Sequence, residues 1–252
     1  MTPHLARIWR HPVKSIGCEA LPRVTLAAGR PMPHDRLWAV AHGGSSWRAE
    51  APGWEGCNNF LRVTHAPRLA AVSARYDPAT GSLTLAHPAR ESLTVDPATP
   101  DGAARLCDWV SPMAEGARPG PYRLAHAPDA AMTDMAEPFI SVLSLASLRA
   151  LSERLGIAPD PRRFRGNLWL DGVVPWEEED WVGRTLRIGG ALLRVVEPIG
   201  RCRATEANPE TGHRDAAILD TLRAARGHTR FGLYAEVLEG GEIAEGAAVE
   251  IA

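Results

Sequence analysis

Short apolar segments separated by turn-forming residues dominate the sequence. In the first 125 residues, apolar stretches such as 36–42 run for four to eight residues before Gly, Pro, Asp or Asn interrupts them. This spacing is typical of short β-strands. The segment 76–85, YDPATGSLTL, fits a β-hairpin in which Asp77, Pro78 and Gly81 supply the turn.

Helical patterns are few by comparison. Within 144–157 four leucines recur at three- or four-residue spacing, and Gly156 follows the last of them, which predicts a helix ending there. Shorter helices fit 101–111 and 214–226, and strand-like segments occupy much of the remaining chain. The sequence therefore predicts a β-rich α+β fold in two lobes, with the break in the Pro- and Gly-rich segment near 112–125.

Charge and apolar content exclude several classes of protein. The 252-residue chain has a net charge of −2, which gives no electrostatic basis for binding a nucleic acid polymer or an anionic membrane. The sequence contains no run of 18 apolar residues that would predict a membrane span, and its first residues lack the apolar core of a secretory signal. We therefore expect a cytoplasmic protein that does not associate with membranes.

The four cysteines do not form a metal-binding pattern. Cys18, Cys57, Cys107 and Cys202 lie far apart and include no C-x-x-C pair, so their spacing excludes a zinc site and an iron–sulfur cluster. We expect free thiols in a reducing compartment. Cys202 stands out because Arg201 precedes it and Arg203 follows it; adjacent positive charge favours a thiolate, although an isolated cysteine is more often a structural bystander.

Several other positions favour an anion. Lys14 is the only lysine among 28 basic residues, and with Ser15 it offers a phosphate an ammonium and a hydroxyl. Arg36 precedes an apolar strand, and Arg165 and Asn167 would share one face of an extended segment. Taken singly, each position also fits a solvated lysine, a surface arginine or a turn asparagine. Together they indicate an anionic, phosphorylated ligand within reach of a thiolate.

Other sequence features bear on the chemistry. The sequence contains no G-x-S-x-G motif, no phosphate-binding P-loop and no dinucleotide-binding fingerprint, so hydrolase and nucleotide-binding functions lack their usual support. The acidic segment between Trp176 and Trp181 is expected to pack its two tryptophans. Its carboxylates are expected to face solvent or pair with arginines.

The order of these motifs resembles the MOSC family, named for the C-terminal domain of molybdenum cofactor sulfurase. The motifs are HPVKS, HDRLWAV, FRGNLWLDG, WEEEDWVG, GRCRATEANPETG and FGLYAEVLEGGEIAEGAAV. Within this family the sequence resembles the mitochondrial amidoxime-reducing component and bacterial N-hydroxy-compound reductases. The resemblance implies an N-terminal β-barrel-like domain over residues 1–118 and a MOSC β-barrel domain with a few helices over residues 125–252.

The resemblance also implies the functional residues. Cys202 corresponds to the protein ligand of molybdenum and is thereby implied to be catalytic. The positions that correspond to cofactor-binding residues are Lys14, Ser15, Arg36, Ser144, Arg165, Asn167 and Arg201. The chain departs from the family pattern at Gly166, Gly200 and Asn208, and most of all in segment 43–59, where substrate access is expected to differ.

By this resemblance the protein is a molybdenum-cofactor-dependent oxidoreductase that reduces N–OH to N–H in small N-hydroxylated compounds. The cofactor is implied to be Mo-molybdopterin. Because the sequence has no cluster cysteines and no dinucleotide fingerprint, we expect an external electron donor, either a ferredoxin-like protein or a flavoprotein. Two alternatives are a carrier of the cofactor or of sulfur without its own turnover, and a relative whose site is vestigial. The sequence does not specify the substrate.

Overall fold

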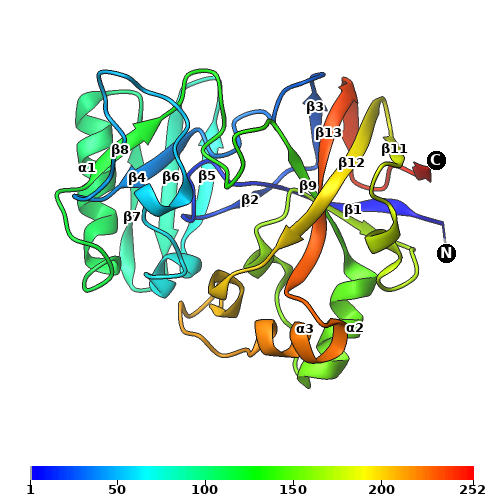
Figure 1. Ribbon diagram of the computed structural model, residues 1–252. Coiled ribbons are helices and arrows are strands. Elements are labelled where there is room, and N and C mark those ends of the chain that lie inside the picture. The colour runs from blue at the N-terminus through cyan, green and yellow to red at the C-terminus, as the bar shows by residue number, and fades with distance from the viewer. Residues whose placement is uncertain (1) are drawn as a thin grey trace.

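An eight-stranded sheet forms the frame of one lobe in the computed structural model, which describes residues 2–252 (Figure 1). In spatial order its strands are β15 (Val249–Ile251), β11 (Thr185–Ile188), β12 (Ala191–Gly200), β13 (Arg230–Glu239), β9 (Ile140–Ser144), β10 (Leu168–Asp171), β1 (His4–Arg10) and β2 (Glu19–Ala20). Neighbouring strands are antiparallel except β9 and β10, which are parallel. A ribbon of β3 (Arg23–Leu26) and β14 (Gly241–Ala244) packs into the same core.

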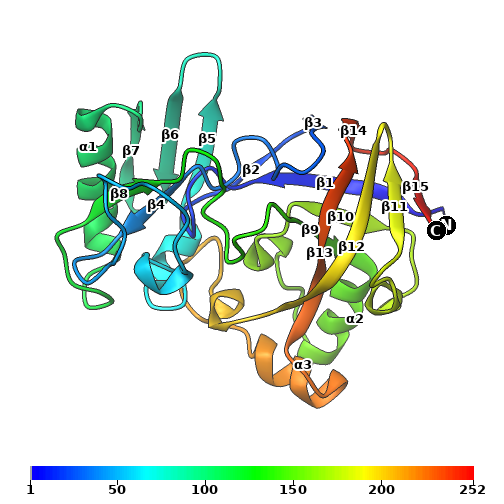
Figure 2. The ribbon, with the colours of Figure 1, turned by 45° about the horizontal axis from the view of Figure 1, so that its top comes forward.

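The other lobe combines two smaller sheets with one helix. Its elements are β4 (Trp38–Ala41), β5 (Ser73–Asp77), β6 (Ser82–His87), β7 (Arg90–Val95), α1 (Pro100–Val110) and β8 (Arg123–His126). Strands β5, β6 and β7 form an antiparallel sheet, and β4 pairs with β8. Leu83 and Leu85 alternate inward on β6 and share a core with Leu106 and Val110 of α1. Figure 2 shows this lobe standing beside the large sheet.

The N-terminal segment belongs to the lobe of the large sheet. Strand β1 pairs with β10, and β3 pairs with β14, so His4–Arg10 and Arg23–Leu26 are held by strands from the second half of the chain. The chain then crosses to the other lobe for β4 to β8 and returns at β9, which leaves both termini at the outer end of the large-sheet lobe (Figures 1 and 2). The predicted β-rich α+β fold in two lobes is confirmed. The division of the sequence into 1–118 and 125–252 stays a prediction.

Local sequence sets the ends of α1 and α2 in the described chain, but not the start of α3. Thr99 caps α1, and Ser144 Oγ accepts a 3.1 Å hydrogen bond from the Ser147 N–H at the start of α2 (Leu145–Leu155). Gly156 ends α2 with a φ of 70°, as predicted. The helix predicted from residue 214 starts later, as α3 (Ile218–Arg226), because Arg214 forms an isolated β-bridge with Ala207 instead. Helices α2 and α3 lie together on one side of the large sheet (Figures 1 and 2).

The acidic segment between the tryptophans folds as a short 3-10 helix, η5 (Glu177–Asp180). Trp181 is buried as predicted, and Glu179 pairs with Arg226. Glu178 contradicts the expectation for the carboxylates, because it is 3% exposed and accepts a 2.8 Å hydrogen bond from the Ser147 hydroxyl. Burial raises the pKa of Glu178 to about 7.

Two further expectations concern membranes and disulfides. Between residues 2 and 252, no helix combines the length and the apolar character needed to cross a lipid bilayer. All four cysteines are free thiols, as predicted. Cys107 is buried, whereas Cys202 is exposed, so the two thiols differ sharply in access.

Candidate functional site

A pocket at the junction of the two lobes gathers seven of the eight residues that the family resemblance singled out. These seven are Lys14, Ser15, Arg36, Arg165, Asn167, Arg201 and Cys202. The eighth, Ser144, does not line the pocket: it is 1% exposed, and its hydroxyl caps α2. Ser141, three residues earlier on β9, lines the pocket in its place.

Three pocket residues have a left-handed backbone conformation, which is unfavourable for residues other than glycine. The φ angle is 62° at Ser15, 48° at Arg36 and 48° at Arg165. Each such residue costs on the order of 1–3 kcal/mol and persists only where its surroundings fix it, commonly at functional sites. The sequence predicted an extended backbone at Arg165, and this prediction is wrong. Arg165 ends the short 3-10 helix η4 (Pro161–Phe164), and this turn brings it into the same pocket as Asn167.

Arg36 and Arg165 are fixed mainly by backbone carbonyls. Arg36 Nη2 donates to the Arg165 carbonyl at 2.8 Å. Arg165 donates two 3.1 Å hydrogen bonds, to the carbonyls of Gly17 and Val13. Arg36 also contacts Asp35, which accepts a 2.7 Å hydrogen bond from the His11 N–H. Burial tends to raise the pKa of Asp35, but Arg36 and the hydrogen bonds from His11 hold this pKa well below its usual range. Burial lowers the pKa of Arg165 to about 10, so this guanidinium group stays charged at neutral pH.

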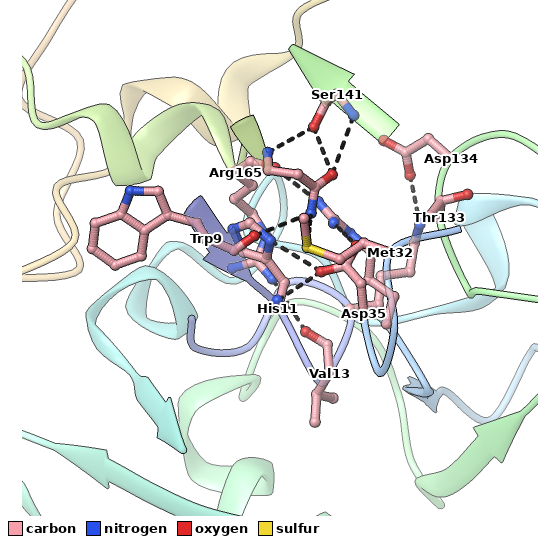
Figure 3. Close-up of polar contacts among 12 residues, drawn as sticks. Trp9, His11, Val13, Met32, Asp35, Thr133, Asp134, Ser141 and Arg165 are labelled. Carbon is pink, nitrogen blue, oxygen red and sulfur yellow. Dashed lines mark hydrogen bonds and ion pairs between the residues drawn. The ribbon is translucent and has the colours of Figure 1, made fainter. Parts of the chain in front are cut away.

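Lys14 is a buried cation with an exposed partner. Its side chain is 5% exposed, and Nζ lies 2.5 Å from Oδ1 of Asp134, which is 63% exposed (Figure 3). Burial lowers the pKa of Lys14, and the contact with Asp134 partly offsets this effect. Asp134 is the one carboxylate among the pocket-lining residues that the structure describes. It thus stands where an anionic ligand would meet Lys14.

Asn167 has the hydrogen-bond partners that a buried polar residue requires. Its Oδ1 accepts from the Ser141 hydroxyl at 2.8 Å and from the Ser141 N–H at 3.2 Å. The Asn167 N–H donates back to the Ser141 hydroxyl at 2.9 Å, and Nδ2 donates to the Trp9 carbonyl at 3.2 Å. These contacts tie β9, β10 and β1 together at the pocket wall (Figure 3).

Arg201 presents an unpaired donor in this pocket. Its Nε donates to the Phe231 carbonyl at 2.7 Å and Nη1 to the Phe164 carbonyl at 2.8 Å. Nη2 is buried and has no hydrogen-bond partner among residues 2–252. Burial lowers the pKa of Arg201 to about 10, so it remains a cation. Gly232 leaves room for it, since a Cβ there would stand 3.1 Å from Nη2 and 2.6 Å from Leu143 Cγ. A buried cationic donor without a partner suits an anionic acceptor.

Cys202 lies two residues after the end of β12 and carries an exposed thiol. Its Sγ lies 3.2 Å from Thr64 Oγ1, which comes from the other lobe. The flanking arginines differ, because Arg201 lines the pocket whereas the Arg203 side chain is 65% exposed and pairs with Glu206 at 3.0 Å. Only one of the two guanidinium groups next to the thiol therefore lines the same pocket.

The pocket fits an anionic cofactor that brings its own metal. Six basic side chains line it: Lys14, Arg36, Arg62, Arg163, Arg165 and Arg201. Within the described chain, no group of three or more His, Cys, Asp and Glu side chains could hold a metal. A metal beside Cys202 would therefore need its remaining ligands from the cofactor, with the thiolate as a soft protein donor.

Family models match nearly the whole chain. The MOSC N-terminal beta barrel domain matches residues 2–120, and the MOSC domain matches residues 129–250. The chain belongs to the MOSC family. In this family member Lys14, Ser15 and Arg36 come from the part that matches the N-terminal barrel, whereas Cys202 comes from the MOSC domain, so both parts build the pocket.

Curated relatives match this MOSC protein over part of their length. Molybdenum cofactor sulfurase 2 of Culex quinquefasciatus is 25% identical over 276 residues, covering 92% of this chain and 34% of the relative. Mitochondrial amidoxime-reducing component 1 of Xenopus laevis is 35% identical over 88 residues, covering 34% of this chain and 25% of the relative. The chain thus spans about a third or less of the length of these relatives. The crystal structure of the YUAD protein from Bacillus subtilis aligns over 100% of this chain and 96% of that chain, with 12% identity and a TM-score of 0.47.

Several pocket residues of the MOSC protein were not predicted from the sequence. They include Arg62, Thr64, Asp134, Ser141 and Tyr234. Ser141 had a local signal, because it is a polar residue between the apolar residues Ile140 and Val142 of β9. Thr64 and Asp134 had none, because they reach the pocket from a turn and a loop whose position depends on the other lobe.

Proposed function

We propose that this MOSC protein binds a molybdenum cofactor between its two lobes and reduces small N-hydroxylated compounds from N–OH to N–H. The observation that carries the proposal is the convergence of an exposed thiol, Cys202, with six basic side chains in one pocket. A relative named for amidoxime reduction supports the reaction class, since an amidoxime carries an N–OH group.

The basic residues deep in the pocket would hold the phosphate of the cofactor. Lys14, Arg36 and Arg165 supply positive charge, and Ser15 supplies a hydroxyl. Charge-assisted hydrogen bonds of this kind are worth about 1.5–3 kcal/mol each. Because the left-handed backbone at three of these positions is fixed before binding, little ordering would remain when the phosphate arrives.

Cys202 would be the protein ligand of molybdenum, and the buried Nη2 of Arg201 would donate to the anionic cofactor. When bound, the cofactor would supply two-electron redox chemistry at its metal. The overall reaction takes up two electrons and two protons, cleaves the N–O bond, and releases the N–H compound and water. The chain itself binds and orients the reactants.

The electrons would come from a separate donor protein, ferredoxin-like or a flavoprotein. Such donor complexes are usually small and transient, which makes them sensitive to salt. The free thiols fit a reducing, cytoplasmic setting for this exchange.

A second function, a carrier of the cofactor or of sulfur, is favoured by the relatives named molybdenum cofactor sulfurase. The exposed sulfur of Cys202 would then hold or pass on its cargo without turning over an external substrate. Turnover separates the two functions, because only the reductase consumes electrons repeatedly.

The test uses the full chain expressed in a host that makes the molybdenum cofactor. Reduced viologen is supplied with benzamidoxime or a hydroxylamine, and viologen oxidation is followed together with formation of the N–H product. We expect repeated turnover by the wild type and none by Cys202→Ala. A matched control is Arg203→Ala, which removes a basic side chain next to Cys202 but outside the pocket, and which should retain activity.

Molybdenum-loaded wild type that fails to turn over several N-hydroxylated substrates would favour the carrier. Full activity in Cys202→Ala would contradict the role of the thiol in either function.

A further inference from the structure

The hydrogen bond between Thr64 and Cys202 joins the two lobes at the sulfur atom. Thr64 Oγ1 lies 3.2 Å from Cys202 Sγ, across 138 residues of sequence. Over residues 2–252 the Thr64 hydroxyl makes no second hydrogen bond to the protein. A thiolate can only accept hydrogen bonds, so in that state the hydroxyl is the donor.

Separate contacts fix the backbones on both sides of this hydrogen bond. Arg214 Nη2 donates to the Thr64 carbonyl at 2.6 Å, and Arg214 Nε lies 3.8 Å from Oε2 of Glu206. Glu206 ends the short 3-10 helix η6 (Arg203–Glu206), which begins directly after Cys202. The Thr205 hydroxyl donates to the Cys202 carbonyl at 3.0 Å. The hydroxyl and the sulfur thus face each other on a ring of contacts that does not depend on their own bond.

The arginines beside the thiol donate their hydrogen bonds elsewhere. Arg201 donates to the carbonyls of Phe231 and Phe164, and Arg203 donates to Glu206. Within the part of the chain that the structure describes, the Thr64 hydroxyl is therefore the hydrogen-bond partner of the sulfur.

We propose that Thr64 is a positioning residue for the metal-ligating thiolate. Its hydroxyl donates a hydrogen bond to Cys202 Sγ, which orients the sulfur and reduces the electron density it offers to the metal. Outer-shell groups of this kind tune metal affinity and activity about 10- to 100-fold, and hydrogen bonds to ligating sulfur help set reduction potentials. The inference rests on the proposed function, in which Cys202 binds molybdenum.

The test compares two substitutions in the full, cofactor-loaded chain. Thr64→Val keeps the branched shape without the hydroxyl, and Thr64→Ser keeps the hydroxyl without the methyl group. The measurements are the midpoint potential of the molybdenum, its paramagnetic resonance spectrum and the cofactor retained after dialysis. We expect Thr64→Val to shift the potential downward and to lose cofactor about 10- to 100-fold more readily, with Thr64→Ser close to wild type. Thr64→Ala is the second hydroxyl-free variant in case valine prevents folding.

Each outcome decides the inference. Wild type and Thr64→Val with the same potential and retention would overturn it while leaving the proposed function intact. Equal shifts in Thr64→Val and Thr64→Ser would also overturn it, because packing of the methyl groups rather than the hydroxyl would then be responsible. Wild type that takes up no molybdenum would overturn both the inference and the proposed function.

Discussion

Replacing Lys14 with methionine separates binding of the cofactor from stability of the fold. The side chain is 5% exposed, so methionine, an apolar chain of similar length, fits the same space. The substitution removes the ammonium and leaves Asp134 without its partner. Because Asp134 is 63% exposed, water can solvate the freed carboxylate. We therefore expect Lys14→Met to weaken cofactor binding while the cofactor-free chain stays folded.

The two effects differ in size. Loss of one charge-assisted hydrogen bond to the phosphate costs about 1.5–3 kcal/mol. Since about 1.4 kcal/mol is a factor of ten, cofactor affinity should fall by about tenfold to 150-fold. In the cofactor-free chain, burial already disfavours the ammonium, which is why the pKa of Lys14 is lowered. The free energy of unfolding should therefore stay within about 1 kcal/mol of the wild type.

Molybdenum per chain, measured by mass spectrometry on protein made with limiting cofactor, reports the first effect. Urea unfolding of the cofactor-free chain reports the second. Arg203→Met is the matched control, since it removes a basic side chain that is 65% exposed and lies outside the pocket. Unchanged molybdenum content in Lys14→Met would refute the reasoning. So would a loss of unfolding free energy as large as the loss of binding free energy.

Three further predictions follow from other groups. Asp134→Asn should tighten binding of inorganic phosphate several-fold, read as thermal protection, because the carboxylate no longer competes for Lys14; weaker binding would contradict this. Glu178 keeps its proton up to about pH 7 when folded but only to about 4.5 when unfolded, so stability falls as pH rises through that window. The unfolding free energy of Glu178→Gln, measured in urea, should therefore rise relative to that of the wild type by about 3 kcal/mol between pH 4 and pH 8. Parallel pH profiles of the two proteins would refute this prediction. The purified, molybdenum-loaded chain should fail to turn over with NADH alone yet work with reduced viologen, and steady turnover on NADH would rule out the need for a separate donor.

Features fixed by neighbouring residues could be predicted from the sequence. The leucines at helical spacing before Gly156 predicted where α2 ends, and the turn residues near Asp77 predicted the β5–β6 hairpin. The expected start of α3 was wrong by several residues, because the backbone of Arg214 forms a β-bridge with Ala207 and its side chain donates to the Thr64 carbonyl of the other lobe. Local propensity does not report such long-range competition.

The site itself was only partly predictable. Residue types favoured by anions, among them Lys14, Arg36 and Arg165, indicated a phosphorylated ligand within reach of a thiolate, and the family resemblance supplied the identity of the cofactor. Ser144 directly precedes the predicted helix, where serine is a common N-cap, yet the family resemblance assigned it to the cofactor. Nothing local showed that Thr64 would meet the thiol. Glu178 read as a solvated carboxylate because three other acidic residues surround it in sequence, yet its backbone turns it inward to the Ser147 hydroxyl.

The central claim is that Cys202 binds the molybdenum of a cofactor held between the lobes. X-ray absorption at the molybdenum edge tests this most directly, with wild type and Cys202→Ala both loaded with cofactor. We predict that the spectrum of the variant loses one sulfur ligand relative to the wild type, while the sulfur atoms contributed by the cofactor remain. The same number of sulfur ligands in both proteins would contradict the claim.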